Sequence, residues 1–237
     1  MMRFGSSRPR ALWSWILTPL VGLALVATGA TAAAEPWRRG AEEDGVVLET
    51  RELAGQPMPE FRGTTIVAAE LYDVAAVVDD LNHYCDWNKR CVKAREYQRV
   101  SDTERVFYTR SGAPWPLSDR DAVLLGRVTG LAEGNDVMVR FEAMADPRWP
   151  AVDGVVRMPV VKGHWRMVRI DAKTTKVEYQ VQVDPGGIVP GWAAKLTAKQ
   201  VPRDTLAGLR RQVAKGPGRY AAFLKRWRDK GEAAAAE

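Results

Sequence analysis

The pattern of hydrophobic and polar positions predicts a chain built mainly of β-strands. In the segment 176–183, KVEYQVQV, the odd positions are apolar and the even positions are polar. This period of two is typical of a strand with one face on an apolar core or pocket and the other in water. Turn residues bound the segments that we expect to be strands: 45–51, 60–68, 91–99, 104–110, 120–129, 135–145, 154–160, 163–170 and 175–183.

Two segments change to the period of a helix. Apolar residues in 69–83 recur at spacings of three and four, which predicts an amphipathic helix. The segment 189–215 predicts a long helix with a kink or short break at Pro202 and a basic side. A shorter helix is expected over 219–227. The basic side of the long helix carries Lys195, Lys199, Arg203, Arg210, Arg211 and Lys215.

No repeat or linker divides the strand-rich part of the chain, so we expect a single α+β domain over residues 45–228. The long C-terminal helix is the only predicted element that is long and apolar enough to cover the sheet. We therefore expect a curved antiparallel sheet wrapped around this helix. The polar segment 35–44 is expected to be flexible, and residues 229–237 are expected to fray.

The N-terminus has the pattern of a secretory signal peptide. Arg3, Arg8 and Arg10 precede an apolar run over 11–26, and small residues fill 27–34. We expect residues 1–34 to be removed after export, with a bacterial periplasm as the expected location. An uncleaved membrane anchor is the alternative, although the apolar run is shorter than the roughly 20 residues that a spanning helix needs.

The formal net charge of +6 permits contact with nucleic acid or an anionic membrane. Three of the basic residues belong to the predicted signal peptide, so the excess of basic over acidic residues falls to three without it. We therefore expect no nucleic-acid partner.

Cys85 and Cys91 are the two cysteines of the chain. Cysteines of exported proteins usually pair, but two buried thiols remain the alternative to a disulfide here. His83 is the only histidine near them, so we expect no metal site, and no motif indicates a cofactor.

Two motifs resemble a known family. Residues 111–123, SGAPWPLSDRDAV, resemble the P-x-P-(V/L)-S-x-R-D segment of START lipid-transfer domains. Residues 183–192, VDPGGIVPGW, resemble the passage from the last strand of that family into its C-terminal helix, and the Gly-x-Trp-x-Met at 163–167 also fits. The resemblance covers about residues 45–215. It implies a helix-grip fold with an internal apolar cavity for one lipid, such as a sterol, a phospholipid or a ceramide.

The resemblance also indicates which apolar residues would face the lipid. A solid core has the same composition as an apolar pocket, so the residues alone leave a filled core open. The expected lipid-binding residues are Phe107, Val139, Phe141, Trp165, Met167, Tyr179, Val181, Trp192 and Leu196.

A loop over 146–153 carries an apolar tip that includes Trp149, Pro150 and Val152. Apolar tips are seldom left in water without a function. We expect these residues, with Ile188 and Val189, to form a lid that also touches the membrane. The alternative is that Trp149 packs inward.

The adjacent Arg120 and Asp121 are interpreted as a structural ion pair or capping pair at the start of a strand, because neighbouring strand residues point to opposite faces.

The resemblance also bears on the polarity of the pocket floor. START domains that carry sterols have a buried arginine and acid in the cavity. Gly126 and Phe107 occupy the corresponding places here, which predicts a less polar pocket floor.

The sequence leaves three functions open. The favoured one is non-enzymatic binding and transfer, or sensing, of a lipid, with transient contact to a membrane. The second is a cyclase or hydrolase on the same fold, but no spacing unites its candidate groups Arg120, Asp121, Tyr108 and His164. The third is a protein-interaction module with a filled core.

Overall fold

A computed structural model of the chain describes residues 35–131, 134–216 and 220, the side chain of Lys195 excepted. The chain divides between residues 32 and 33, and every described residue belongs to the second unit. The predicted signal peptide 1–34, the tail 229–237 and the helix over 219–227, apart from Tyr220, lie outside the described residues. Of the helices described, none has the length and apolar character needed to span a membrane.

One sheet forms the frame of the described part. Its strands are β1 Arg38–Glu43, β2 Val46–Arg51, β3 Glu60–Val67, β4 Cys91–Arg99, β5 Glu104–Ser111, β6 Arg120–Thr129, β7 Asp136–Ala143, β8 Val156–Arg157, β9 Val160–Asp171 and β10 Thr174–Asp184. They are ordered β1-β2-β3-β10-β9-β7-β6-β5-β4, and the short β8 adds to β6. All neighbours are antiparallel except β6 and β8.

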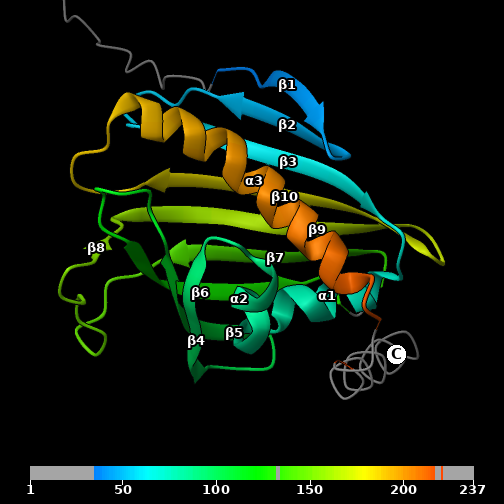
Figure 1. Cartoon of the computed structure of the whole chain (residues 1–237). Coiled ribbons are helices and arrows are strands. Elements are labelled where there is room, and N and C mark those ends of the chain that lie inside the picture. The colour runs from blue at the N-terminus through cyan, green and yellow to red at the C-terminus, as the bar shows by residue number, and fades with distance from the viewer. Residues whose placement is uncertain (1–34, 132–133, 217–219, 221–237) are drawn as a thin grey trace, which may run out of the picture. The chain divides into compact units, whose positions relative to one another are not determined.

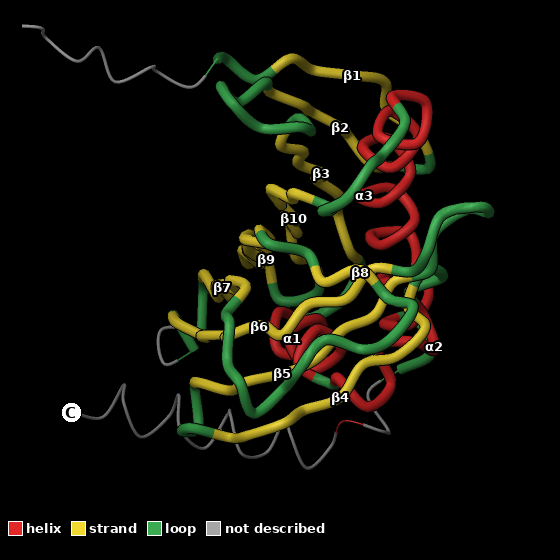
Figure 2. The backbone as a smooth tube through the Cα atoms, turned by 90° about the vertical axis from the view of Figure 1, so that its left-hand side faces the viewer, coloured by secondary structure: helices red, strands yellow, loops and turns green. Residues whose placement is uncertain are grey.

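The helices lie on one face of this sheet. They are α1 Leu71–Asp79, the 3-10 turn η1 Leu81–His83, α2 Tyr84–Trp87 and α3 Gly191–Val213. Figure 1 shows α3 crossing the sheet diagonally, and Figure 2 shows the strands following a curve with the helices on its inner side. The predicted curved sheet around a C-terminal helix is confirmed.

The core lies where α3 and α1 press on the sheet. Leu206 and Leu209 of α3 have no exposed surface, and neither has Val74 of α1. Their spacing of three or four residues along each helix puts them on the face toward β2, β3 and β9. Val46 and Val177 meet them from the strands.

The segment 35–44 contains β1, so the expectation of a flexible start is wrong for residues 38–43. β1 pairs with β2, and Glu43 also forms ion pairs with Lys199 at 2.8 Å and Arg203 at 2.9 Å on α3. Polar composition indicated a loose segment, but its charges have partners far away in the sequence.

The turn expected between the segments 154–160 and 163–170 is wrong. β9 runs unbroken from Val160 to Asp171, and the strand expected over 154–160 shrinks to the two residues of β8. A Cβ at Gly163 would clash first with the backbone oxygen of Gln180 on β10, and it would lie 2.8 Å from Cζ of Phe141 on β7. The glycine therefore allows a backbone and a ring to approach closely instead of turning the chain.

The two helical segments also differ from expectation. The segment 69–83 is divided, because the helix ends at Asp79 and Asp80 leaves helical geometry at φ −78° and ψ 82°. The long helix continues through Pro202, so the alternative of a break there is wrong. Proline lacks an N–H, so this residue forgoes the bond to the carbonyl of Ala198.

Candidate functional site

Two cross-strand rows of residues cover the inner face of the sheet. The first row runs Val128, Val139, Trp165, Tyr179 across β6, β7, β9 and β10. The second runs Gly126, Phe141, Gly163, Val181, Phe61 from β6 to β3. Alternation along each strand turns these residues to the side of α3, as the period of two predicts.

An internal cavity of about 220 Å³ separates these rows from α3. Voids in well-packed interiors rarely exceed a water molecule, so a cavity of this size is not a packing defect. On α3 its wall is Ala193, Thr197, Val201 and Thr205, spaced four residues apart on one face of the helix. This finding weighs against the filled-core module.

Six of the nine predicted wall residues line the cavity: Phe107, Val139, Phe141, Trp165, Tyr179 and Val181. Met167 does not, because it lies fully buried on the part of β9 that α1 covers. Trp192 and Leu196 do not either, and they are 53% and 36% exposed. They lie one residue before the wall positions Ala193 and Thr197. The stripe of small and β-branched residues at a spacing of four was the signal for the α3 wall.

Two aromatic rings cover glycines. Phe141 lies against Gly163, and Phe107 lies against Gly126, where an added Cβ would come within 2.9 Å of Cε1 of the ring. The strands can therefore carry large rings without being pushed apart. The aromatic set continues with Trp165 and Tyr179, whose ring centroids are 4.4 Å apart.

The inner end of the cavity holds a buried charge that the sequence did not reveal. Arg105, on β5, lines the cavity with a side chain that is 7% exposed, and its Nη1 lies 2.8 Å from Oδ1 of Asp79 at the end of α1. Burial lowers the pKa of Arg105, and the Asp79 carboxylate opposes that shift. The expectation of a less polar floor holds at Gly126 and Phe107 but is wrong for the floor as a whole.

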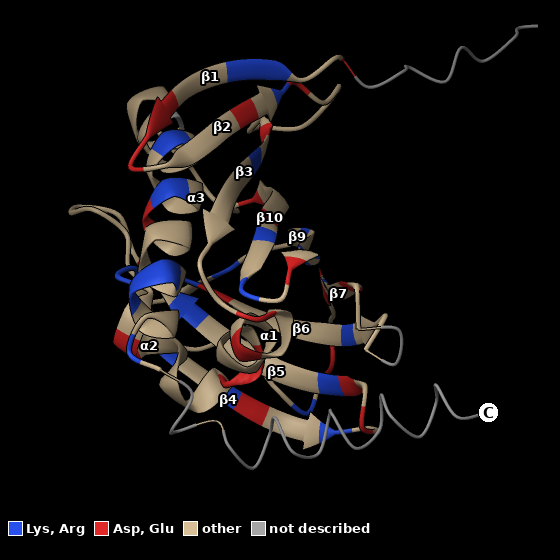
Figure 3. Cartoon of the chain, turned by 90° about the vertical axis from the view of Figure 1, so that its right-hand side faces the viewer, with Lys and Arg blue, Asp and Glu red and all other residues tan. Residues whose placement is uncertain are grey.

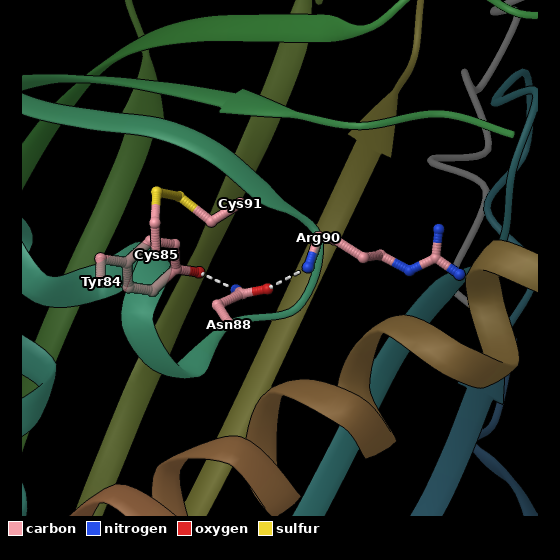
Figure 4. The surroundings of a disulfide bond; sticks show 5 residues. All are labelled: Tyr84, Cys85, Asn88, Arg90 and Cys91. Carbon is pink, nitrogen blue, oxygen red and sulfur yellow. Dashed lines mark hydrogen bonds between the residues drawn. A yellow bond between two sulfur atoms is a disulfide. The ribbon is translucent and has the colours of Figure 1, made fainter.

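A disulfide joins Cys85 of α2 to Cys91 of β4, with their Cα atoms 4.8 Å apart. The chain between them forms a corner (Figure 4), and Asn88 and Arg90 of this corner line the cavity. Asn88 donates to the hydroxyl of Tyr84 at 2.6 Å, and its Oδ1 accepts from the backbone N–H of Arg90 at 3.1 Å. Burial raises the pKa of Tyr84 to about 12, so its hydroxyl stays protonated.

The other end of the cavity is formed by the loop that follows β5 and the loop that precedes α3. Ala113, Pro114 and Leu117 line it from the first loop, and Pro185 and Val189 line it from the second. We call this end the mouth. Three large apolar side chains beside the mouth are exposed to solvent. Their exposed fractions are 90% for Trp115, 91% for Ile188 and 53% for Trp192.

The adjacent Arg120 and Asp121 do not pair with each other. Asp121 has no exposed surface and binds Arg157 at 2.7 Å on the outer face of the sheet. Arg120 points to the inner face, lines the cavity and donates to the carbonyl of Ser118. The structural role therefore belongs to the pair Asp121 and Arg157.

The predicted lid residues are in different places. Trp149 stacks on Tyr97 of β4 with ring centroids 5.2 Å apart, on the outer face of the sheet. Arg157 fixes its loop by donating to the carbonyls of Trp149 and Pro150. The cavity is lined by Val189 but not by Trp149, Pro150 or Val152. We therefore revise the predicted lid to the loop that precedes α3.

The candidate groups for an enzyme are divided between the two faces of the sheet. Tyr108 and Asp121 belong to the outer face, and burial raises the pKa of Tyr108 to about 12, with Asp121 adding to the shift. His164 also points outward, where its Nε2 lies 3.0 Å from Glu178 and its hydrogen bond lowers the pKa of that carboxyl. Arg120 alone lines the cavity. No group of side chains suited to a metal ion occurs among the residues described.

Three basic residues of α3 bind the β1–β2 hairpin. Lys199 and Arg203 bind Glu43, and Arg210 donates to the carbonyl of Asp44 at 2.6 Å. These cations, seen along α3 in Figure 3, hold the β1–β2 hairpin in place. The basic residues at these positions therefore stabilise the fold.

Comparison with known proteins identifies the family. The family model of the START domain matches residues 23–215, which is most of the chain. The chain belongs to the START domain family. A crystal structure of a STAR-related lipid transfer protein from Xanthomonas axonopodis, fragment 25–204, is 33% identical to this START domain. It superimposes with a TM-score of 0.69 and covers 76% of this chain and 99% of that one.

Two curated relatives are similar to this START domain over most of their length. An uncharacterised protein of Pseudomonas aeruginosa is 28% identical over 197 residues, which is 83% of this chain and 96% of the relative. The mouse phosphatidylcholine transfer protein is 24% identical over 168 residues, 69% of this chain and 77% of the relative. The similarities support a lipid-binding domain and the helix-grip fold.

Proposed function

We propose that this protein binds one lipid in the cavity between the sheet and α3 and transfers it between membranes without chemical change. The cavity carries the proposal, because most of its lining is apolar and it lies in a domain whose family includes lipid-transfer proteins. A free lipid chain costs roughly 0.8 kcal/mol per CH₂ in water. An apolar cavity removes much of that cost during transfer.

We further propose that the mouth docks on the membrane. Trp115, Ile188 and Trp192 are large, apolar and exposed around the opening. Tryptophan and isoleucine at such positions favour the interface between headgroups and acyl chains. The docked protein would place the opening against the bilayer, so the lipid need not cross water.

Export is the third part of the proposal. The basic, apolar and small-residue regions of 1–34 support a cleaved signal peptide, and the periplasm is the proposed location. The disulfide between Cys85 and Cys91 supports an oxidising compartment.

The test is native mass spectrometry of the full chain after expression with its own leader, followed by lipid extraction. We expect one bound lipid per protein. The variant Val139→Trp, which puts an indole into the cavity from β7, should carry none.

Arg140→Trp is the matched control. Arg140 follows Val139 on β7 and is exposed, so the same indole lies on the outer face and lipid should be retained. Circular dichroism confirms that both variants are folded. An empty wild-type protein, or lipid retained in folded Val139→Trp, would contradict the proposal.

A further inference from the structure

The cavity has an unbalanced charge. Its lining includes four arginines, and none of the lining residues in the described part of the chain is an aspartate or a glutamate. A charge beside an apolar cavity is costly unless it is paired. The four are Arg90, Arg105, Arg110 and Arg120.

Two of these arginines are neutralised by carboxylates behind the lining. Arg105 binds Asp79 at 2.8 Å, and Arg110 binds Asp119 at 2.7 Å. Asp121, the neighbour of Arg120, binds Arg157 on the opposite face of the sheet. These three carboxylates are therefore already paired.

The other two arginines have no acidic partner among the described residues. Arg120 is 9% exposed and donates only to the backbone carbonyl of Ser118. Arg90 donates through Nη2 to the amide oxygen of Gln200 at 2.6 Å. Its Nε is buried, and no hydrogen-bond partner occurs for it in the described part of the chain. Since a guanidinium has five N–H donors, both keep donors for a ligand.

The sheet register brings the two arginines to the same end of the cavity. Cys91, Ser111 and Arg120 form one cross-strand row over β4, β5 and β6. Arg90 precedes this row, and its carbonyl accepts from the N–H of Gly112 at 2.9 Å. Two strand spacings separate the backbones, about 10 Å, which two arginine side chains can bridge to one shared anion. Figure 4 shows Arg90 extending from the disulfide corner beside α3.

We propose that the cavity selects a lipid with a net negative headgroup, whose charged oxygens Arg90 and Arg120 bind at the mouth while the acyl part fills the apolar interior. Guanidinium groups match phosphate and carboxylate oxygens in geometry and charge. A zwitterionic headgroup would bring a cation as well, and the lining offers it no carboxylate. This inference rests on the proposed lipid-binding function and names the class of lipid.

The test uses competition within one membrane. The full-chain protein is incubated with vesicles that contain equal amounts of phosphatidylglycerol and phosphatidylcholine with the same acyl chains, then separated, and its bound lipid is quantified by mass spectrometry. We expect about tenfold enrichment of phosphatidylglycerol, the value of one charge-assisted hydrogen bond. In Arg120→Gln and in Arg90→Gln the ratio should fall toward one, and Arg120→Lys should keep part of it.

Lys176→Gln is the control for charge. It removes one positive charge from an exposed position on β10, away from the lining, and should leave the ratio as in the wild type. Arg90 is only half-buried, so Arg90→Gln carries the test if Arg120→Gln fails to fold.

The outcomes separate the two proposals. Equal capture of both lipids by the wild type, or more phosphatidylcholine, overturns the selectivity and leaves lipid binding intact. No capture of either lipid overturns both. Thermal unfolding with inorganic phosphate, against chloride at equal ionic strength, tests a small anion as the ligand. We expect no difference, and a stabilisation by phosphate that Arg120→Gln abolishes would overturn the assignment to a lipid.

Discussion

Arg157 stabilises the fold at a place away from the cavity, where it binds Asp121. Asp121 is completely buried, and its two oxygens accept from Arg157 at 2.7 and 3.2 Å. The same guanidinium holds the loop of Trp149. One arginine therefore balances a buried charge and fixes a surface loop.

Arg157→Ala should lower the free energy of unfolding by about 3–5 kcal/mol, because it leaves the buried Asp121 carboxylate without its charged partner. Urea unfolding at neutral pH measures the loss. Arg148→Ala is the matched control. It removes an exposed arginine that binds Asp146 in the same loop, and should lower the free energy of unfolding far less than Arg157→Ala does. Equal losses for the two variants would contradict the special role of Arg157.

Individual contacts were the least predictable level of this structure. The alternation of apolar and polar residues put Phe141, Trp165 and Tyr179 on the inner face, and the structure agrees. Trp149 could not be placed in this way, since its partner Tyr97 lies some fifty residues earlier on another strand. The buried ion pair of Arg105 could not be predicted for the same reason, because Asp79 comes from a separate helix.

At the scale of elements, the β1–β2 hairpin is attached to α3 through Glu43. The hydrogen bonds from Lys199 and then from Arg203 lower the pKa of this carboxyl below its ordinary value of 4.5. A lowered carboxyl pKa stabilises the fold above the ordinary value. That contribution is lost as the pH falls from about 4.5 through the lowered value.

We expect Glu43→Gln to expose β1 to faster amide hydrogen exchange at neutral pH, while the protection of β9 stays unchanged. In the wild type the protection of β1 should decline below about pH 4.5, and in the variant this dependence should be weaker. Glu42→Gln, at the exposed neighbouring position, is the control. Unaltered exchange of β1 in Glu43→Gln would show that the ion pairs do not hold the hairpin.

Most elements follow from periodicity, and the exceptions have local causes. The strands from β2 to β7, together with β10, lie within a few residues of the predicted segments, as does α3. Gly163 was misinterpreted because a glycine that makes room for a ring and a glycine that turns a chain look alike in sequence. β1 was not predicted because its sequence is polar, and the ion pairs of Glu43 join it to α3, which is far away in the sequence.

At the scale of the whole domain, the exposed apolar side chains gather at one end of the cavity. Trp115 was not singled out in the sequence, since one tryptophan between prolines carries no period. Its significance appears only when the fold brings its loop and the loop of Ile188 to the same opening. The existence of the cavity itself was open for the same reason, because apolar composition does not distinguish a pocket from a filled core.

The double variant Trp115→Ala/Ile188→Ala should weaken binding to vesicles by about tenfold, because each side chain would otherwise leave water for the bilayer. Co-sedimentation with vesicles measures this. Ile170→Ala, which removes an exposed isoleucine at the opposite end of the sheet, should leave binding unchanged. Equal vesicle binding by the wild type and the double variant would place the membrane contact elsewhere.

Pro202 divides α3 into halves with different attachments. Beyond it, Leu206, Leu209 and Val213 are buried in the core, whereas before it Trp192 and Leu196 are partly in water and Ala193 and Thr197 line the cavity. The missing N–H removes one bond between the halves. Local unfolding of the first half therefore breaks few core contacts and costs only part of the global free energy of unfolding. Under the proposed function, exchange of the lipid would then not require unfolding of the core, so the rate of exchange and the thermal stability would be set by different halves of α3.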